Sequence, residues 1–156
     1  MIIIEKLTER DIASVMAIEL PAEQIKFAST TEEFLASGSE TIKLHIIKSD
    51  GDVVGFFKLD SAYAEHYDFC PQGAIGLRTF AIDKRCQGKG IGTGAIKALF
   101  TYLKTHYTAY RMVYLTVNCK NPSAIACYKK NGFENSEQLY LGGAEGPQHI
   151  MSFALK

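Results

Sequence analysis

Residues 80–103 read FAIDKRCQGKGIGTGAIKALFTYL, and this stretch decides the fold. It begins as an apolar strand, continues through glycines at every second position from Gly88 to Gly94, and becomes an apolar helical pattern from Ile91. Glycine loses more conformational freedom on folding than any other residue, so such a cluster indicates a requirement of the backbone. The start of a helix also presents free N–H groups and a positive dipole end. The stretch therefore predicts a phosphate-binding turn between a strand and a helix.

The rest of the chain surrounds this unit with further strand and helix patterns. Strands are expected at 1–6, 41–48, 52–59, 74–82, 112–117, 133–141 and 148–155, and a bulge is expected near Arg78–Thr79. Helices are expected after Thr8, after Thr30 or Thr31, and over 91–106 and 122–130, whereas 61–72 (SAYAEHYDFCPQ) has the pattern of a loop. This order predicts an α/β fold with a mixed sheet and a strand–helix–strand crossover at its centre. No repeat or linker divides the chain, so we expect one domain over residues 1–156.

Composition narrows the class of protein. The chain has 17 basic and 17 acidic residues and a formal net charge of zero, which argues against a nucleic-acid partner. Its start, MIIIEKL, has too short an apolar run for a signal peptide or a membrane span, so we expect a cytoplasmic protein without a membrane partner. The four cysteines form no C-x-x-C pair and the four histidines complete no zinc pattern, so no metal is expected.

The glycine-rich turn admits more than one phosphate ligand. GIGTGA fits the dinucleotide pattern G-x-G-x-x-G/A, but that pattern needs an acidic residue about 20 positions further on, and 101–120 contains none. A P-loop requires Ser or Thr after its lysine, whereas Lys89 is followed by glycine. Both nucleotide interpretations are therefore weaker than a third one.

The third interpretation is a resemblance. The stretch is similar to the acetyl-CoA motif Q/R-x-x-G-x-G/A of the GNAT superfamily of N-acetyltransferases, here Gln87-Gly88-Lys89-Gly90-Ile91-Gly92. A second motif of that superfamily, N-x-x-A-x-x-x-Y-x-x-x-G-F after a strand, matches LTVNCKNPSAIACYKKNGF at Asn121, Ala124, Tyr128, Gly132 and Phe133. The resemblance implies a single acetyltransferase domain over 1–156. Its fold would be a central twisted, mostly antiparallel sheet with a parallel, splayed strand 4–strand 5 pair and about four helices.

The resemblance also implies the cofactor and its site. Acetyl-CoA would be the cosubstrate, with its pantetheine arm along one strand, its pyrophosphate on the glycine-rich turn and its thioester in the splayed gap. The residues implied in binding are Phe80, Ala81, Ile82, Gln87, Gly88, Lys89, Gly90, Ile91, Gly92, Thr93, Asn121 and Tyr128. Asn121 precedes Pro122 and is equally suited to cap a helix.

The implied reaction is direct attack of a primary amine on the acetyl carbonyl, through a tetrahedral intermediate. Tyr128 matches the tyrosine that protonates the departing thiolate in many members, a transfer that the pKa values of phenol and thiol permit. The amine must first lose a proton. The sequence leaves four candidates open for the base, namely Glu65, His66, Asp68 and Asp83.

The acceptor is the least determined part. Glu65, Tyr67 and Asp68 suit a small cationic amine. PAEQIKFAS at 21–29 resembles the polyamine/diamine acetyltransferase branch, so a polyamine-like acceptor is our first expectation. An N-terminal or lysine amine, a homodimer, a non-catalytic acyl-CoA-binding module and an NAD(P)-dependent oxidoreductase remain the alternatives.

Overall fold

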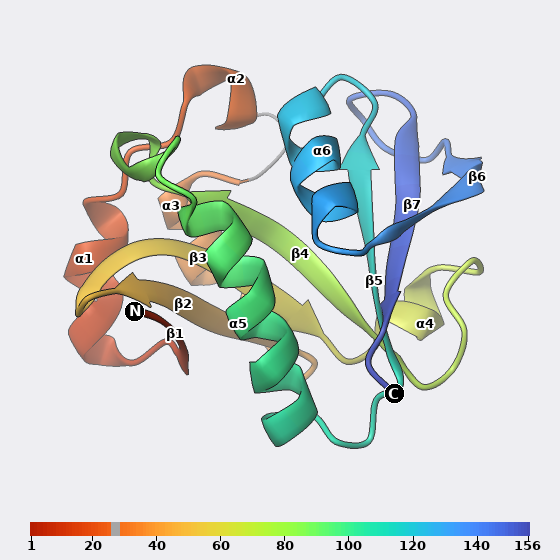
Figure 1. The fold of residues 1–156 in the computed structure, drawn as a ribbon, viewed down its shortest axis with the longest axis horizontal. Coiled ribbons are helices and arrows are strands. Elements are labelled where there is room, and N and C mark those ends of the chain that lie inside the picture. Colours follow the sequence, from red (N-terminus) through yellow and green to blue (C-terminus); the bar gives the residue numbers. More distant parts are fainter. Residues whose placement is uncertain (26–28) are drawn as a thin grey trace.

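The seven strands in the described part of the chain lie in one sheet (Figure 1). The computed structural model describes residues 1–25 and 29–156. The strand order is β1-β2-β3-β4-β5-β7-β6, and every neighbouring pair is antiparallel except β4 and β5. This arrangement confirms the expected mixed sheet with one parallel pair. The strands are β1 (Ile2–Lys6), β2 (Ile42–Ser49), β3 (Asp52–Asp60), β4 (Ala74–Ile82), β5 (Met112–Asn118), β6 (Glu134–Tyr140) and β7 (Gln148–Ala154).

Helices cover both faces of the sheet. The described residues form α1 (Ile12–Met16), α2 (Ala22–Ile25), α3 (Thr31–Ala36), α4 (Tyr63–His66), α5 (Ile91–His106) and α6 (Pro122–Lys130). The expectation of about four helices corresponds to α1, α3, α5 and α6, while α2 and α4 are single turns of four residues. None of the helices in residues 1–25 and 29–156 is long and apolar enough to cross a membrane.

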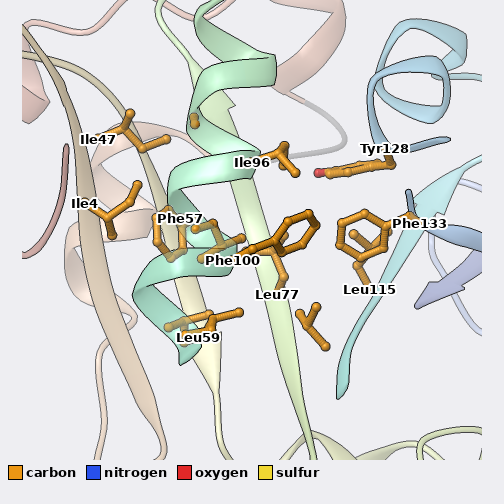
Figure 2. Close-up of a cluster of buried hydrophobic side chains, with 14 of the residues drawn as sticks. Ile4, Ile47, Phe57, Leu59, Leu77, Ile96, Phe100, Leu115, Tyr128 and Phe133 are labelled. Carbon is orange, nitrogen blue, oxygen red and sulfur yellow. The ribbon is translucent and has the colours of Figure 1, made fainter. Parts of the chain in front are cut away.

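Alternating residues of the strands form apolar clusters on the two faces of the sheet. On one face, Phe57 and Leu59 of β3 belong to the same apolar cluster as Ile96 and Phe100 of α5 (Figure 2). On the opposite face, Phe56 stacks on Phe34 of α3 with ring centroids 4.2 Å apart. Side chains alternate across a strand, so one apolar run such as VVGFFKL can bury residues on both faces.

Two local expectations are corrected. The segment 61–72, expected as a loop, contains α4, because the backbone N–H of Ala62 donates to buried Asp60 (2.8 Å) and the ring of Tyr63 is buried. The helix after Thr8 begins as a 3-10 turn and ends at Met16, well before Leu20. Pro21 disfavours helical backbone in the residue before it. The motif PAEQIKFAS includes residues 26–28, which lie outside the described residues.

The parallel pair opens along its length. β4 and β5 pair only at Ala74–Gly76 against Met112–Tyr114, and the two strands separate beyond that point. β4 also carries the expected bulge: its register against β3 shifts between Ala81 and Arg78, and Thr79 has a φ of 55°. The bulge bends the strand away from a regular ladder. The gap that results is the centre of the candidate site.

Candidate active site

The separated strands enclose the main cavity. Its volume is about 430 Å³, and Leu77 to Phe80 of β4 face Leu115 to Asn118 of β5 across it. The loop between β6 and β7 also lines the cavity, through Gly142 to Glu145. A carbonyl compound held here would lie beside two strand backbones whose ladder has ended, where main-chain N–H and C=O groups are available for pairing.

Tyr128 lies in the wall of this cavity. It is the buried tyrosine of α6, and its ring contacts those of Phe80 (centroids 6.3 Å apart) and Phe133 (5.3 Å). Figure 2 shows the ring extending from α6 into the space beside α5. Among the described residues the hydroxyl has no hydrogen-bond partner. Burial raises the pKa of Tyr128, so the phenol remains protonated through the neutral range.

The glycine-rich turn leads into the N-terminus of α5. Gly88 and Gly90 have φ values of 78° and 77°, the left-handed region that favours glycine, and a Cβ at either position would meet open space. No side chain caps the helix. The N–H groups of its first turn are therefore free for an anion. Residues 87–90 are exposed, and the side chain of Gln87 is tied back to the Ile82 carbonyl at 3.2 Å.

The turn and α6 are neighbours. A Cβ at Gly92 would lie 3.7 Å from the sulfur of Cys127, so the first turn of α5 packs close to α6. Asn121 is the N-cap residue of α6 and accepts a hydrogen bond from the backbone N–H of Ala124 at 3.4 Å. It also lines the cavity. The structure thus gives Asn121 the capping role and places it where the sequence predicts a cofactor contact.

Sequence reasoning missed the polar part of the cavity wall. Arg78 of β4 donates from Nε to buried Asp60 at 2.9 Å and from Nη2 to the hydroxyl of Tyr67 at 3.3 Å. Its guanidinium lies 5.1 Å from the ring centre of Tyr63 and 5.2 Å from that of Tyr67, close enough for cation–π contact. The available signal is a charged residue inside an apolar strand, which by itself indicates a bulge and not the partners of Arg78.

A second missed feature holds the loop over the cavity. Asn118, at the end of β5, donates from Nδ2 to the backbone carbonyl of Glu145 at 3.0 Å and accepts from the N–H of Lys120 at 2.8 Å. Asn118 is buried and pairs with Gln148 of β7. This side chain therefore fixes the β6–β7 loop to the strand that lines the gap.

The predicted acceptor and base residues are only partly brought together. Tyr67 lines the cavity, whereas Glu65, His66 and Asp68 are exposed and lie outside its lining. Asp83 is buried and pairs with Arg85, whose hydrogen bonds lower the pKa of this carboxyl. Within the described ranges, no three His, Cys, Asp or Glu side chains gather as a metal site.

A splayed parallel pair, an uncapped helix N-terminus and a tyrosine beside the gap lie next to one another at the centre of the fold. The family model described as "Acetyltransferase (GNAT) family" matches residues 12–133, and the chain belongs to this family. It is thus an acetyltransferase that uses acetyl-CoA and acts on an amine. The family model covers the glycine-rich turn, so the family assignment favours the acetyl-CoA interpretation over the dinucleotide one.

Individual relatives agree with the family. The spermine/spermidine N(1)-acetyltransferase of Bacillus subtilis (strain 168) is 29% identical over 145 residues, which cover 90% of this chain and 92% of that protein. Among solved structures, the aminoglycoside acetyltransferase AAC(6')-Ib in complex with coenzyme A has a TM-score of 0.77 at 21% identity, covering 99% of this chain and 95% of that one. The spermidine N-acetyltransferase from Vibrio cholerae, in complex with CoA and spermine, has a TM-score of 0.72 at 15% identity, with 99% and 95% covered.

Proposed function

We propose that this enzyme transfers the acetyl group of acetyl-CoA to a primary amine of a small, polyamine-like cation. The observation that carries the proposal is the continuous arrangement of the α5 N-terminus, the β4–β5 gap and Tyr128. An anion site, an opened strand and a proton donor are the parts that thioester aminolysis requires. The polyamine acceptor is supported by the spermine/spermidine N(1)-acetyltransferase of Bacillus subtilis, whose match covers 90% of this chain and 92% of that protein.

The residues present fit acetyl-CoA. The N–H groups from Gly88 to Thr93 would hold the pyrophosphate, since no side chain caps that helix end and glycine leaves the backbone open. The backbone of Phe80, Ala81 and Ile82 would pair with the pantetheine arm beside the bulge. The thioester carbonyl supplies the electrophile, and the chain's part is to orient it in the gap.

Tyr128 would complete the transfer as a general acid. The amine nitrogen forms a bond to the acetyl carbon, the carbon–sulfur bond breaks, and the sulfur takes the phenolic proton. Tyr128 is a buried residue whose phenol stays protonated and makes no hydrogen bond to the described residues, so its proton is available for this donation. Because the four candidate bases lie outside the cavity lining, we propose that the proton of the attacking amine leaves through solvent water.

The acceptor side of the cavity suits an alkyl cation. Tyr140 lines it, and tyrosine rings attract alkylammonium groups through their faces. Arg78 is paired with Asp60, which offsets its charge, and the acidic loop residue Glu145 is among the residues that line the cavity.

The test measures turnover of acetyl-CoA with each amine of a panel. The release of free CoA gives the rate, and mass spectrometry identifies the acetylated product. The panel holds polyamines, amino acids, aminoglycosides and peptides, and we expect the highest kcat/KM with spermidine or spermine. A higher value for an aminoglycoside or a peptide would overturn the acceptor assignment. Binding of acetyl-CoA without turnover of any amine would instead identify a non-catalytic acyl-CoA-binding module.

A further inference from the structure

Two glycines in the β6–β7 loop are required by space and not by backbone conformation. Gly142 and Gly143 line the main cavity, and neither has the positive φ that favours glycine. A Cβ at Gly142 would lie 2.5 Å from the hydroxyl oxygen of Tyr140, and a Cβ at Gly143 would lie 2.1 Å from Nε2 of Gln148. The two glycines therefore leave room for the polar ends of two particular side chains, Tyr140 and Gln148.

These two side chains belong to one row across the sheet. Tyr140 of β6 lies opposite Gln148 of β7, which in turn lies opposite Asn118 of β5. Residues directly opposite each other on neighbouring strands project from the same face of a sheet. Tyr114, at an alternate position of β5, projects from that face as well and packs in the apolar cluster of α4. The row therefore lies on the face of the sheet that α4 covers.

Tyr128 lies on the other face of the sheet. Leu115 and Val117, the intervening residues of β5, belong to the same apolar cluster as Tyr128 of α6. Tyr140 and Gln148 line the same cavity as Tyr128, but from the α4 face. With acetyl-CoA bound along the α5 and α6 side of the gap, the α4 face is the one left for the amine.

Tyr140 and Gln148 offer free polar groups on this face. Both are half-buried, and neither side chain makes a hydrogen bond to another residue in the described part of the chain. The ring of Tyr140 is held by edge contacts with Tyr67 (centroids 5.3 Å apart) and Phe69 (5.9 Å). Little side-chain freedom is left to lose when a ligand binds to a group that is already oriented.

We propose that Tyr140 and Gln148 bind the attacking amine and determine the acceptor specificity of the enzyme, and that Gly142 and Gly143 position them. The phenol oxygen and the amide oxygen each accept a hydrogen bond from an N–H group. The role of these residues rests on the proposed acetyl transfer in the β4–β5 gap, whether the amine is a polyamine or another primary amine.

Three variants test the contacts with the amine. Tyr140→Phe removes the hydroxyl, Gln148→Ala removes the amide, and Gly143→Ala displaces it, because Nε2 is the free end of a flexible side chain that can swing away. Each should raise the KM for the amine about fivefold, the effect of losing one hydrogen bond of about 1 kcal/mol. The KM for acetyl-CoA and the Kd for CoA should stay unchanged.

The matched controls make the same changes outside the main cavity. Gln138→Ala shortens a glutamine of β6 that is absent from the lining of this cavity. Gly38→Ala adds a Cβ at an exposed glycine that also lacks a positive φ, and its nearest neighbour would be a Leu44 side-chain atom at 3.5 Å, an ordinary contact. Both controls should keep the wild-type KM for the amine.

A double variant separates positioning from damage to the loop. In the Gln148→Ala background, the Cβ introduced by Gly143→Ala no longer meets an amide, so it should not raise the KM for the amine any further. A loop distorted by Gly143→Ala would instead raise this KM equally in both backgrounds.

Steady-state kinetics are measured with spermidine and with kanamycin as the amine, and calorimetry gives the Kd for CoA. The proposal is overturned if Tyr140→Phe and Gln148→Ala keep the amine KM of the controls, or if Gly143→Ala acts equally with and without Gln148. A higher kcat/KM with kanamycin than with spermidine would contradict the polyamine acceptor. The KM values of the variants with kanamycin would then still decide the role of Tyr140 and Gln148.

Discussion

Asp60 and Arg78 join β3 and β4 at the edge of the main cavity through a hydrogen-bonded ion pair. Nε of Arg78 lies 2.9 Å from Oδ2 of Asp60, whose side chain is 1% exposed, while that of Arg78 is 30% exposed. The register explains the contact, since Asp60 lies opposite Gly76 and Arg78 is two residues further along the same face of β4. A buried carboxylate with one cation partner makes the stability of the site depend on that cation.

The first prediction concerns this pair. Arg78→Met leaves the Asp60 carboxylate buried and without its cation, and we expect the free energy of unfolding to fall by about 3 kcal/mol. Adding Asp60→Asn keeps an oxygen for the N–H of Ala62 and removes the unpaired charge, so the double variant should regain part of that loss. Urea denaturation of the two single variants and the double variant gives the coupling. Strictly additive losses would contradict a direct interaction.

The second prediction concerns Tyr128. If its phenol protonates the leaving thiolate, Tyr128→Phe should lower kcat by at least about tenfold, within the usual range for general-acid catalysis. The Kd for CoA should stay unchanged, because the ring and its contacts with Phe80 and Phe133 are kept. Steady-state kinetics and calorimetry with CoA measure the two effects. Tyr107→Phe, which removes a half-buried phenol at the far end of α5, should leave kcat at the wild-type value.

The third prediction separates backbone strain from ligand binding at the glycine-rich turn. Gly90 has a φ of 77° and Gly51, in the β2–β3 turn, a φ of 90°, and a Cβ at either would have no neighbour within 4 Å. Gly90→Glu and Gly51→Glu should therefore each lower the free energy of unfolding by about 1 kcal/mol. Only Gly90→Glu should abolish CoA binding, because it places a carboxylate where we propose that the pyrophosphate binds. Equal CoA affinity in both variants would show that the turn does not bind the cofactor.

The fourth prediction concerns the pH dependence of stability. His45 is fully buried between Phe57 and Tyr102, and burial lowers the pKa of its imidazole from 6.5 to about 4. Above pH 6.5 both the folded and the unfolded state hold it neutral. Between pH 6.5 and 4 only the unfolded state binds the proton, so stability should fall by roughly 3 kcal/mol as the pH is lowered through this window.

Denaturation midpoints at pH 7.5, 5.5 and 4 measure this loss. His45→Gln should flatten the profile between pH 6.5 and 4, although its stability at pH 7.5 is lower because the contacts with Tyr102 and the Lys43 carbonyl are disturbed. His66→Gln, which replaces an exposed histidine, is the control and should keep the wild-type slope. An unchanged slope in His45→Gln would assign the acid sensitivity to other groups.

Much of the fold was predictable because its signals are local. The glycines before Ile91, the helical spacing that follows, and Asn121 before Pro122 each specify a turn or a cap through their own backbone chemistry. The bulge at Thr79 was also visible, as a break in the alternation of one strand. By contrast, α4 was missed, since Tyr63 is held by packing against Gly76, where an added Cβ would lie 2.1 Å from its ring.

The candidate site also has one part that local sequence motifs predict and another that only the folded sheet brings together. The glycine-rich turn and Tyr128 lie in contiguous motifs, and through these motifs the sequence by itself determined the family, the cosubstrate and the transferred group. Only the tertiary structure decided that β7 lies between β5 and β6, that Asn118 holds the loop at Glu145, and that Arg78 pairs with Asp60. Those contacts join residues far apart in the chain through strand order and side-chain packing. No local pattern encodes such pairings, because their free energy arises only once the whole sheet has assembled.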